Sequence, residues 1–402
     1  MQSKREDDSD VQAIVQLLAA ATIGTTNLVE DVHRRIVHPP LLPSTPIQNL
    51  ISKIAGWSFS ATRGITKVVA GTIDTGLSVL PSFGNIKETE KKEALRSVLN
   101  GVIGDYLERE NNGLQIKMEF RHKGNSFSVN EKLASNLIPN PKRRIILCVH
   151  GLCMNDIQWT SNNHNHGDEL AKEMDATAIH LHYNTGRHIS SNGKEFSELL
   201  QNLLGAWPVP VEEIVILAHS MGGLVSRSAL HYGLEENKEW TEYIKKVVFL
   251  GTPHHGAGLE KLGSYVDRAL ESFPYLKPFA RLGKIRSAGI TDLRYGNLLQ
   301  RDWEKQLQYN APSDLREHLP LVEGINYFAV AAHIDPAAKS VSAKVVGDGL
   351  VTEESAFGRH KYPEKCLNFE ADKTLLVGAT DHWGLLSSPI VYEQLKKWLV
   401  VS

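Results

Sequence analysis

One short segment constrains the fold of this chain more than any other. The apolar run Ile214–Leu217 leads directly into Ala218-His219-Ser220-Met221-Gly222, and a helix-like pattern follows. This pattern predicts a buried strand that turns sharply into a helix and raises a serine hydroxyl at the turn, with small neighbours because backbone packs closely there. Ser220 is therefore the candidate nucleophile. Taken alone, the pentapeptide would equally suit a serine that caps the helix.

Length and charge narrow the class of protein. A chain of 402 residues is long enough for one large core and an accessory part, because single cores stop growing at roughly 250–300 residues. A net charge of -2, with both signs spread along the chain, argues against a nucleic-acid partner.

The cysteines and the apolar segments bear on location. Three cysteines are too few and too odd in number for a disulfide framework, and they lack the paired spacing of a metal site. The acidic start of the chain lacks the basic lead-in of a secretory signal, and no apolar run reaches the roughly 18–20 residues of a membrane span. We expect a cytoplasmic protein without metal, and leave peripheral contact with a lipid surface and the oligomeric state open.

The chain divides by pattern near residue 112. Residues 1–112 show helical periodicity broken by prolines, as in the apolar positions from Leu95 to Tyr106, and predict a helical accessory region. Three roles for this region stay open: its apolar faces pack on the rest of the chain, or they cover an active site, or they lie on a lipid surface. Residues 113–402 predict the main domain, which begins with an edge hairpin over 113–130.

Short apolar runs then alternate with helical segments, which is typical of parallel strands joined by crossover helices. A helical insertion over residues 257–318 follows one strand and predicts a cap or lid. The expected strands are Ile145–Val149, Ala178–Tyr183, Ile214–Ala218, Val247–Leu250, Asn326–Ala331 and Thr374–Val377. Functional side chains are expected where these strands end, because the loops there form the crevice of an open α/β sheet.

The first of these strand ends carries His150-Gly151-Leu152. A tetrahedral acyl intermediate places negative charge on oxygen, and two fixed backbone N–H donors stabilise it. The amides of Leu152 and Met221 are the expected donors, because Met221 follows the candidate nucleophile. The alternative is that Gly151 serves a turn and nothing more.

A serine hydroxyl needs a base that is itself held by a carboxylate. In the strand–serine–helix architecture, the acid and then the histidine follow late in the chain, which selects Asp348 and His382. Asp381 is the rival acid and His219, His254 and His255 are the rival bases. We assign His150, Gly151, His219 and His254 to the walls of the substrate site. Asp-Gly pairs and lone histidines also occur as ordinary turn and structural residues.

This ordered set of motifs resembles bacterial esterases and lipases of the α/β-hydrolase superfamily, with triacylglycerol lipases and inositol-deacylase-like hydrolases the most similar groups. The resemblance covers residues 143–402. Ala218 departs from the glycine that many members have there, a change of one methyl group. The resemblance implies an α/β-hydrolase fold, a mostly parallel sheet with helices on both faces, here with an N-terminal helical extension and an inserted helical cap.

The chemistry predicted is cofactor-independent hydrolysis of a carboxylic ester or lipid through an acyl-enzyme on Ser220, with Asp348 orienting His382. Acyl transfer, thioester cleavage and polyester cleavage would use the same three residues. A non-catalytic module that binds lipid or a partner is the alternative from another class.

Overall fold

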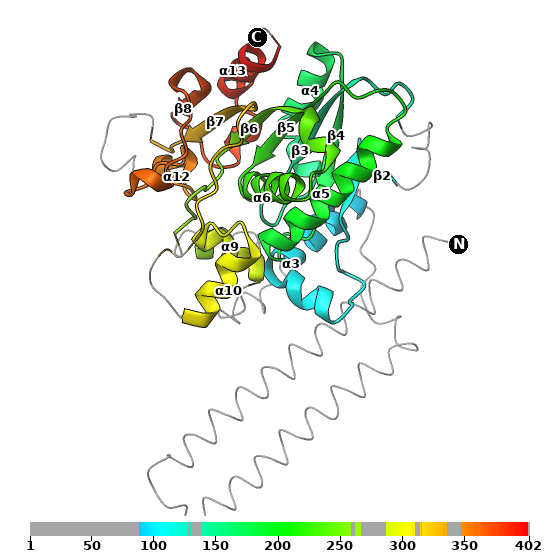
Figure 1. Ribbon diagram of the computed structural model, residues 1–402. Coiled ribbons are helices and arrows are strands. Elements are labelled where there is room, and N and C mark those ends of the chain that lie inside the picture. Colours follow the sequence, from blue (N-terminus) through cyan, green and yellow to red (C-terminus); the bar gives the residue numbers. More distant parts are fainter. Residues whose placement is uncertain are drawn as a thin grey trace, which may run out of the picture. The chain divides into compact units, whose positions relative to one another are not determined.

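A computed structural model describes residues 88–127, 129, 138–258, 262–266, 287–309, 314, 316–335 and 347–400. Contacts divide the chain into two units, and the larger one comprises Thr89–Glu110 and Gln115–Ser402. The described residues of this larger unit form a sheet with helices packed on it (Figure 1). The helical patterns predicted before residue 88 lie outside the described residues.

One sheet organises the larger unit. Its described strands lie in the order β2-β1-β4-β3-β5-β6-β7-β8. From β4 to β8 every pair of neighbours is parallel, and β1 is antiparallel to both of its neighbours. The strands are β1 (Glu119–His122), β2 (Asn125–Phe127), β3 (Arg144–Val149), β4 (Ala176–His182), β5 (Glu213–His219), β6 (Ile244–Leu250), β7 (Asn326–Ala332) and β8 (Thr374–Val377).

The register of this sheet brings the expected functional segments to one edge. Val149 of β3 pairs with Ala218 of β5, and His219 pairs with Leu250 of β6. Because these strands are parallel, the loops that follow them emerge side by side. The segments after Val149, His219 and Leu250 are therefore neighbours in space.

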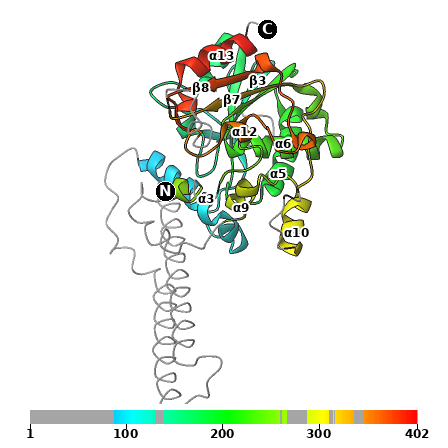
Figure 2. The same ribbon diagram turned by 90° about the vertical axis from the view of Figure 1, so that its left-hand side faces the viewer.

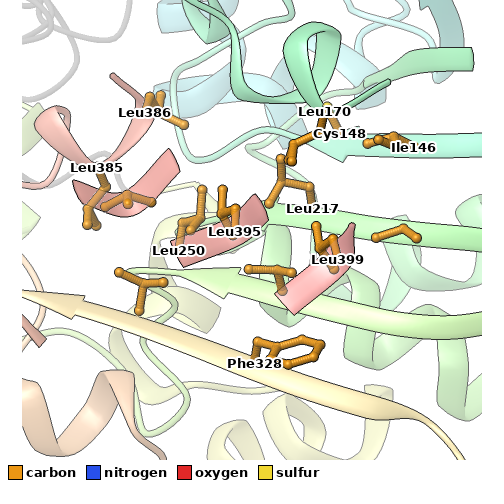
Figure 3. Close-up of a cluster of buried hydrophobic side chains, with 14 of the residues drawn as sticks. Ile146, Cys148, Leu170, Leu217, Leu250, Phe328, Leu385, Leu386, Leu395 and Leu399 are labelled. Atoms are coloured by element: carbon orange, nitrogen blue, oxygen red, sulfur yellow. The ribbon is translucent and has the colours of Figure 1, made fainter. Parts of the chain in front are cut away.

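Helices cover both faces of the sheet. Figures 1 and 2 show α5 (Ile189–Ala206) and α6 (Met221–Glu235) on one face and α13 (Pro389–Leu399) on the other. Leu395 and Leu399 of α13 share a buried cluster with Leu170 of α4 (His166–Glu173) and with strand residues such as Leu217 (Figure 3). Each such leucine contributes about 1.5–3 kcal/mol by its burial. The structure also describes α3 (Glu88–Arg109), α9 (Ala288–Tyr295), α10 (Gln300–Tyr309), α12 (Glu353–Ala356) and a short helix over residues 262–266.

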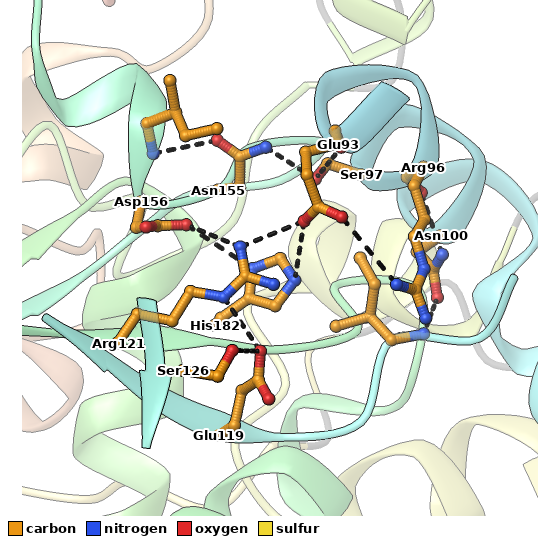
Figure 4. Close-up of polar contacts among 12 residues, drawn as sticks. Glu93, Arg96, Ser97, Asn100, Glu119, Arg121, Ser126, Asn155, Asp156 and His182 are labelled. Carbon is orange, nitrogen blue, oxygen red and sulfur yellow. Dashed lines mark hydrogen bonds and ion pairs between the residues drawn. The ribbon is translucent and has the colours of Figure 1, made fainter. Parts of the chain in front are cut away.

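A buried ion-pair network ties α3 to the edge of the sheet (Figure 4). Arg121 of β1 places its Nη1 atom 3.0 Å from both Glu93 of α3 and Asp156, and its Nε atom 2.8 Å from Glu119. Burial opposes the charge of Arg121, but the carboxylates of Asp156 and Glu93 outweigh it and raise the pKa of the guanidinium. Three carboxylates thus compensate one buried cation.

The sequence predictions of the sheet are confirmed. Every expected parallel strand is present, and the mostly parallel sheet with helices on both faces is the predicted α/β fold. The apolar alternation from Leu114 to Phe120 forms strand only at its end, where β1 begins at Glu119. Residues 262–266, α9 and α10 are helical within the predicted insertion. The division at residue 112 stays a prediction, although α3 clusters with the sheet from Thr89 onward.

Candidate active site

Ser220 occupies a strained turn between β5 and α6. Its backbone has φ 54° and ψ -126°, a region that a non-glycine residue adopts at a cost of about 1–3 kcal/mol. Two hydrogen bonds hold it there: its N–H donates to the Leu250 carbonyl at 2.8 Å, and its carbonyl accepts from Gly223 at 3.1 Å. The side chain is therefore presented at the strand ends, as the sequence predicts for an elbow.

Glycines on both sides make this turn possible. A Cβ atom at position 151 would lie 2.9 Å from the Ser220 Cβ atom, which is closer than real side chains approach. A Cβ atom at position 222 would lie 2.7 Å from the His150 carbonyl oxygen. The small residues flanking Ser220 in sequence and in space thus have a packing reason.

Asp348 and His382 form a buried hydrogen-bonded pair. The Asp348 Oδ2 atom lies 2.6 Å from His382 Nδ1, and the His382 amide donates to the Asp348 carbonyl at 3.0 Å. The other carboxylate oxygen, Oδ1, accepts from the amides of Leu350 at 3.0 Å and Val351 at 2.7 Å. Three contacts of the carboxylate and one of the backbone carbonyl thus fix Asp348 against the ring.

This pairing decides which ring nitrogen of His382 carries the proton. A carboxylate only accepts, so neutral His382 carries its proton on Nδ1 and leaves the lone pair on Nε2. The Nε2 atom is buried and has no hydrogen-bond partner among the described residues. His382 is thus set up as a base at Nε2.

Ser220 and His382 meet at the end of β6. The Ser220 amide bonds to Leu250, and the His382 ring lies against Gly251, where a Cβ atom would be 3.1 Å from its Cε1 and Nδ1 atoms. His219 links the two segments further: its Nε2 atom lies 3.0 Å from the His382 carbonyl oxygen, so Nε2–H donates. The three sequence-selected residues therefore lie together at the C-terminal edge of the sheet.

The expected donors for an oxyanion also lie at this edge. Among the described residues, the amide N–H groups of Leu152 and Met221 make no hydrogen bond. The Leu152 carbonyl accepts from the Tyr265 hydroxyl at 2.9 Å, and the His150 carbonyl accepts from the Tyr183 hydroxyl at 2.8 Å. Two tyrosines thus fix the loop that carries the Leu152 amide.

Asp381, the alternative candidate for the acid, has a structural role. Asp381 is exposed, and its Oδ1 atom accepts from the Gly384 amide at 2.7 Å. This bond holds the first residue of the short helical turn Gly384–Leu386, and among the described residues no hydrogen bond joins Asp381 to the His382 ring.

His150, His219 and His254 are buried and neutral. Burial lowers the pKa of His150 to about 4, and its ring stacks on Tyr183 at 4.4 Å between centroids. Burial, followed by the neighbouring His382, holds the pKa of His219 well below its ordinary value. His254 packs edge-on against Phe249 and faces Arg227, whose Nη1 atom is 3.4 Å from His254 Nδ1. Roles for these three in substrate binding stay predictions.

An aromatic wall beside His382 includes Trp383, which was not singled out from the sequence. Trp383 is 39% exposed and stacks on Tyr265 with 5.7 Å between ring centroids and 8° between planes. The Tyr265 ring in turn lies 6.4 Å from the His382 ring. The only sequence signal was a tryptophan directly after the candidate base.

The described residues hold no group of three or more His, Cys, Asp or Glu side chains that could bind a metal ion. Cys148, Cys153 and Cys366 are free thiols. Burial raises the pKa of Cys153 to about 12, which makes it a poor nucleophile.

Residues 141–322 match the family model of the PGAP1-like alpha/beta domain. This part of the chain is therefore similar to the PGAP1-like α/β domain. The domain contains Ser220, Leu152 and Met221, whereas Asp348 and His382 follow the matched residues. The family model confirms the expected α/β-hydrolase superfamily. No curated protein matches the chain.

Solved structures that resemble the chain carry several hydrolase names. Phospholipase PlaB from Legionella pneumophila is 15% identical, with a TM-score of 0.36 over 53% of this chain and 45% of that one. An esterase from Pyrococcus furiosus is 16% identical, with a TM-score of 0.37 over 70% of this chain and 90% of that one. The Pyrobaculum calidifontis esterase is 11% identical, with a TM-score of 0.36 over 80% and 92%. The chain thus spans less than half the length of the Legionella phospholipase.

Proposed function

We propose that this protein is a serine carboxylic-ester hydrolase with Ser220 as nucleophile, His382 as base and Asp348 as its orienting acid. The observation that carries the proposal is the His382 ring, held on Nδ1 by Asp348 and bare at a buried Nε2, beside a serine in a strained turn.

The reaction proceeds in two halves. In the first, His382 Nε2 takes the proton of Ser220 as its Oγ attacks the acyl carbon, and the Leu152 and Met221 amides hold the oxyanion. His382 then returns the proton to the leaving alcohol, and an ester of Ser220 remains. In the second half His382 activates water in the same way, and the acid is released with Ser220 restored.

The apolar side chains beside His382 indicate which kind of acyl group the site accepts. Trp383, Tyr265 and the half-exposed Ile334 border the residues of the proposed triad; Ile334 lies beside Gly349, next to Asp348. Apolar side chains at a reaction site favour an apolar acyl chain, since burial of its methylenes contributes about 0.8 kcal/mol each.

Hydrolysis of esters of increasing chain length tests the proposal. We expect turnover by the wild-type chain, with rates that rise with chain length, and loss of turnover in Ser220→Ala. Unchanged hydrolysis in Ser220→Ala would refute it. Competing alcohol and thiol acceptors in the same assay separate hydrolysis from acyl transfer, since a hydrolase releases the free acid alone.

Lipid as the natural source of the ester is part of the proposal. Among the described residues, no helix has both the length and the hydropathy to cross a membrane. A membrane substrate would therefore be reached by the described part from the surface of the bilayer, and added vesicles in the assay reveal this as a rise in rate.

A further inference from the structure

A pocket whose lining shares no residue with the proposed triad carries an excess of positive charge. Arg227, Arg316 and Lys365 line it, together with His254 and Asp314. Asp314 is the one carboxylate that pairs with cations of this group in the described residues: it accepts from Arg316 at 2.7 and 2.9 Å and lies 3.1 Å from Lys365. Glu317 also lines the pocket, so with the lining histidines neutral three cations face two carboxylates.

Arg227 is the cation that Asp314 does not compensate. It lies on α6, it is 7% exposed, and the contacts of its guanidinium in the described residues are the Leu319 carbonyl and His254 Nδ1. A guanidinium has five N–H donors, so most of its donors have no acceptor among the residues that the structure describes. Within the same residues, no carboxylate pairs with Arg227.

The contrast with Arg121 shows how unusual this is within the chain. Both arginines are buried, but Arg121 contacts Glu93, Glu119 and Asp156. The pKa of Arg121 is raised, whereas burial, with a smaller effect from the charge of Arg316, lowers the pKa of Arg227 to about 10. Arg227 still carries its charge at neutral pH, and a buried charge without a counter-ion is costly.

The tautomer of His254 adds a donor to the same pocket. Arginine only donates, so His254 Nδ1 is the acceptor of the Arg227 contact, and the proton of the neutral ring sits on Nε2. This Nε2–H group is buried and has no hydrogen-bond partner in the described part of the chain. A lining residue therefore carries an unmet donor next to an uncompensated cation.

We propose that this pocket binds a phosphate-type oxyanion through Arg227, with Lys365 and Arg316 adding positive charge. Guanidinium and ammonium groups are the usual protein partners of phosphate, because they form short charge-assisted hydrogen bonds to its oxygens. The group bound is either free inorganic phosphate or the phosphate of a lipid headgroup. The site is independent of ester hydrolysis and does not require Ser220.

Calorimetric titration of the full chain with inorganic phosphate, at constant ionic strength set by chloride, tests the proposal. We expect saturable binding at one site, weakened about tenfold or more in Arg227→Met and a few-fold in Lys365→Met, because each loses a charged partner of the anion. Arg143→Met is the matched control, since Arg143 is a surface arginine paired with Glu212; its binding should equal that of the wild type.

Folding of the variants is checked by the urea midpoint. Lys365 is partly exposed, so Lys365→Met gives a decisive answer even if Arg227→Met fails to fold. The proposal would be overturned if the wild type showed no saturable binding of phosphate. It would also be overturned if Lys365→Met, and Arg227→Met where that variant folds, bound phosphate as tightly as the wild type.

Vesicles separate the two sources of phosphate. Co-sedimentation with phosphatidylcholine vesicles that contain phosphatidic acid, lost in Arg227→Met or Lys365→Met, identifies a headgroup site. Phosphate binding without such co-sedimentation identifies a free-ion site. The measurements are repeated in Ser220→Ala, where binding should persist, so failure of the proposed hydrolase and failure of this site are told apart.

Discussion

Replacing Asp348 by asparagine is expected to remove most of the activity while leaving the turn intact. The amide oxygen of asparagine can still accept from Leu350 and Val351, which Asp348 Oδ1 does at 3.0 and 2.7 Å. The amide NH₂ then faces His382 Nδ1, where the carboxylate lay at 2.6 Å. A donor at this point forces the ring proton onto Nε2, so the base loses its lone pair toward Ser220.

The expected loss in kcat is about 10³–10⁴-fold, equivalent to about 4–5 kcal/mol of barrier. The assay is steady-state hydrolysis of a p-nitrophenyl ester, with KM expected to change little because the acid does not touch substrate. Asp381→Asn is the matched control: Asp381 adjoins His382 in sequence but caps a helical turn, so its variant should stay within a few-fold of wild type. A loss below tenfold in Asp348→Asn, or an equal loss in Asp381→Asn, would refute the assignment.

Three further outcomes are expected. Gly151→Ala should lower kcat by about 10²-fold with the fold retained by circular dichroism, because its Cβ would lie 2.9 Å from that of Ser220; normal activity would contradict this packing. Burial lowers the pKa of His150 and His166 to about 4, so the unfolded chain binds more protons between pH 6.5 and 4. The free energy of unfolding, measured in urea, should therefore decrease as the pH is lowered from 6.5 to 4, by roughly 3 kcal/mol per histidine at most. A free energy that stays constant over this range would count against buried neutral rings. Trp383→Ala should raise KM several-fold for long-chain esters and little for acetate, whereas equal effects on both would exclude it from the acyl site.

Local patterns predicted the sheet well because buried parallel strands are short apolar runs. The strands β3, β5 and β6 lie where Ile145–Val149, Ile214–Ala218 and Val247–Leu250 were expected, with ends that differ by up to three residues. The hairpin was less well placed: the alternation begins at Leu114, but strand pairing requires a partner, and β4 pairs with β1 only from Glu119.

The residues of the candidate site were selected in the same way, from their order along the chain. Ser220, Asp348 and His382 follow three different strand ends, and the sheet register brings those ends together. Contacts between distant segments had no such signal. The stacking of Trp383 on Tyr265 depends on how the insertion over residues 257–318 packs against the segment after β8, and no local sequence pattern predicts that packing.

The pocket at Arg227 shows the same limit. Its lining comes from α6 and from segments near residues 254, 316 and 365, which are far apart in sequence. Sequence reasoning placed His254 in the substrate site, because Gly251-Thr252-Pro253-His254 follows β6. In the structure its ring faces Arg227, a contact that depends on how α6 packs against the loop, and the role of His254 in the substrate site stays a prediction.

Peptide mapping after reaction with a fluorophosphonate tests the central claim most directly, because this reagent phosphonylates a serine that an adjacent base activates. The account predicts a single adduct on Ser220, formed at a rate that falls by orders of magnitude in His382→Ala, while Ser220→Ala takes up no label. An unlabelled Ser220, or label on another serine that persists in Ser220→Ala together with ester hydrolysis, would contradict it.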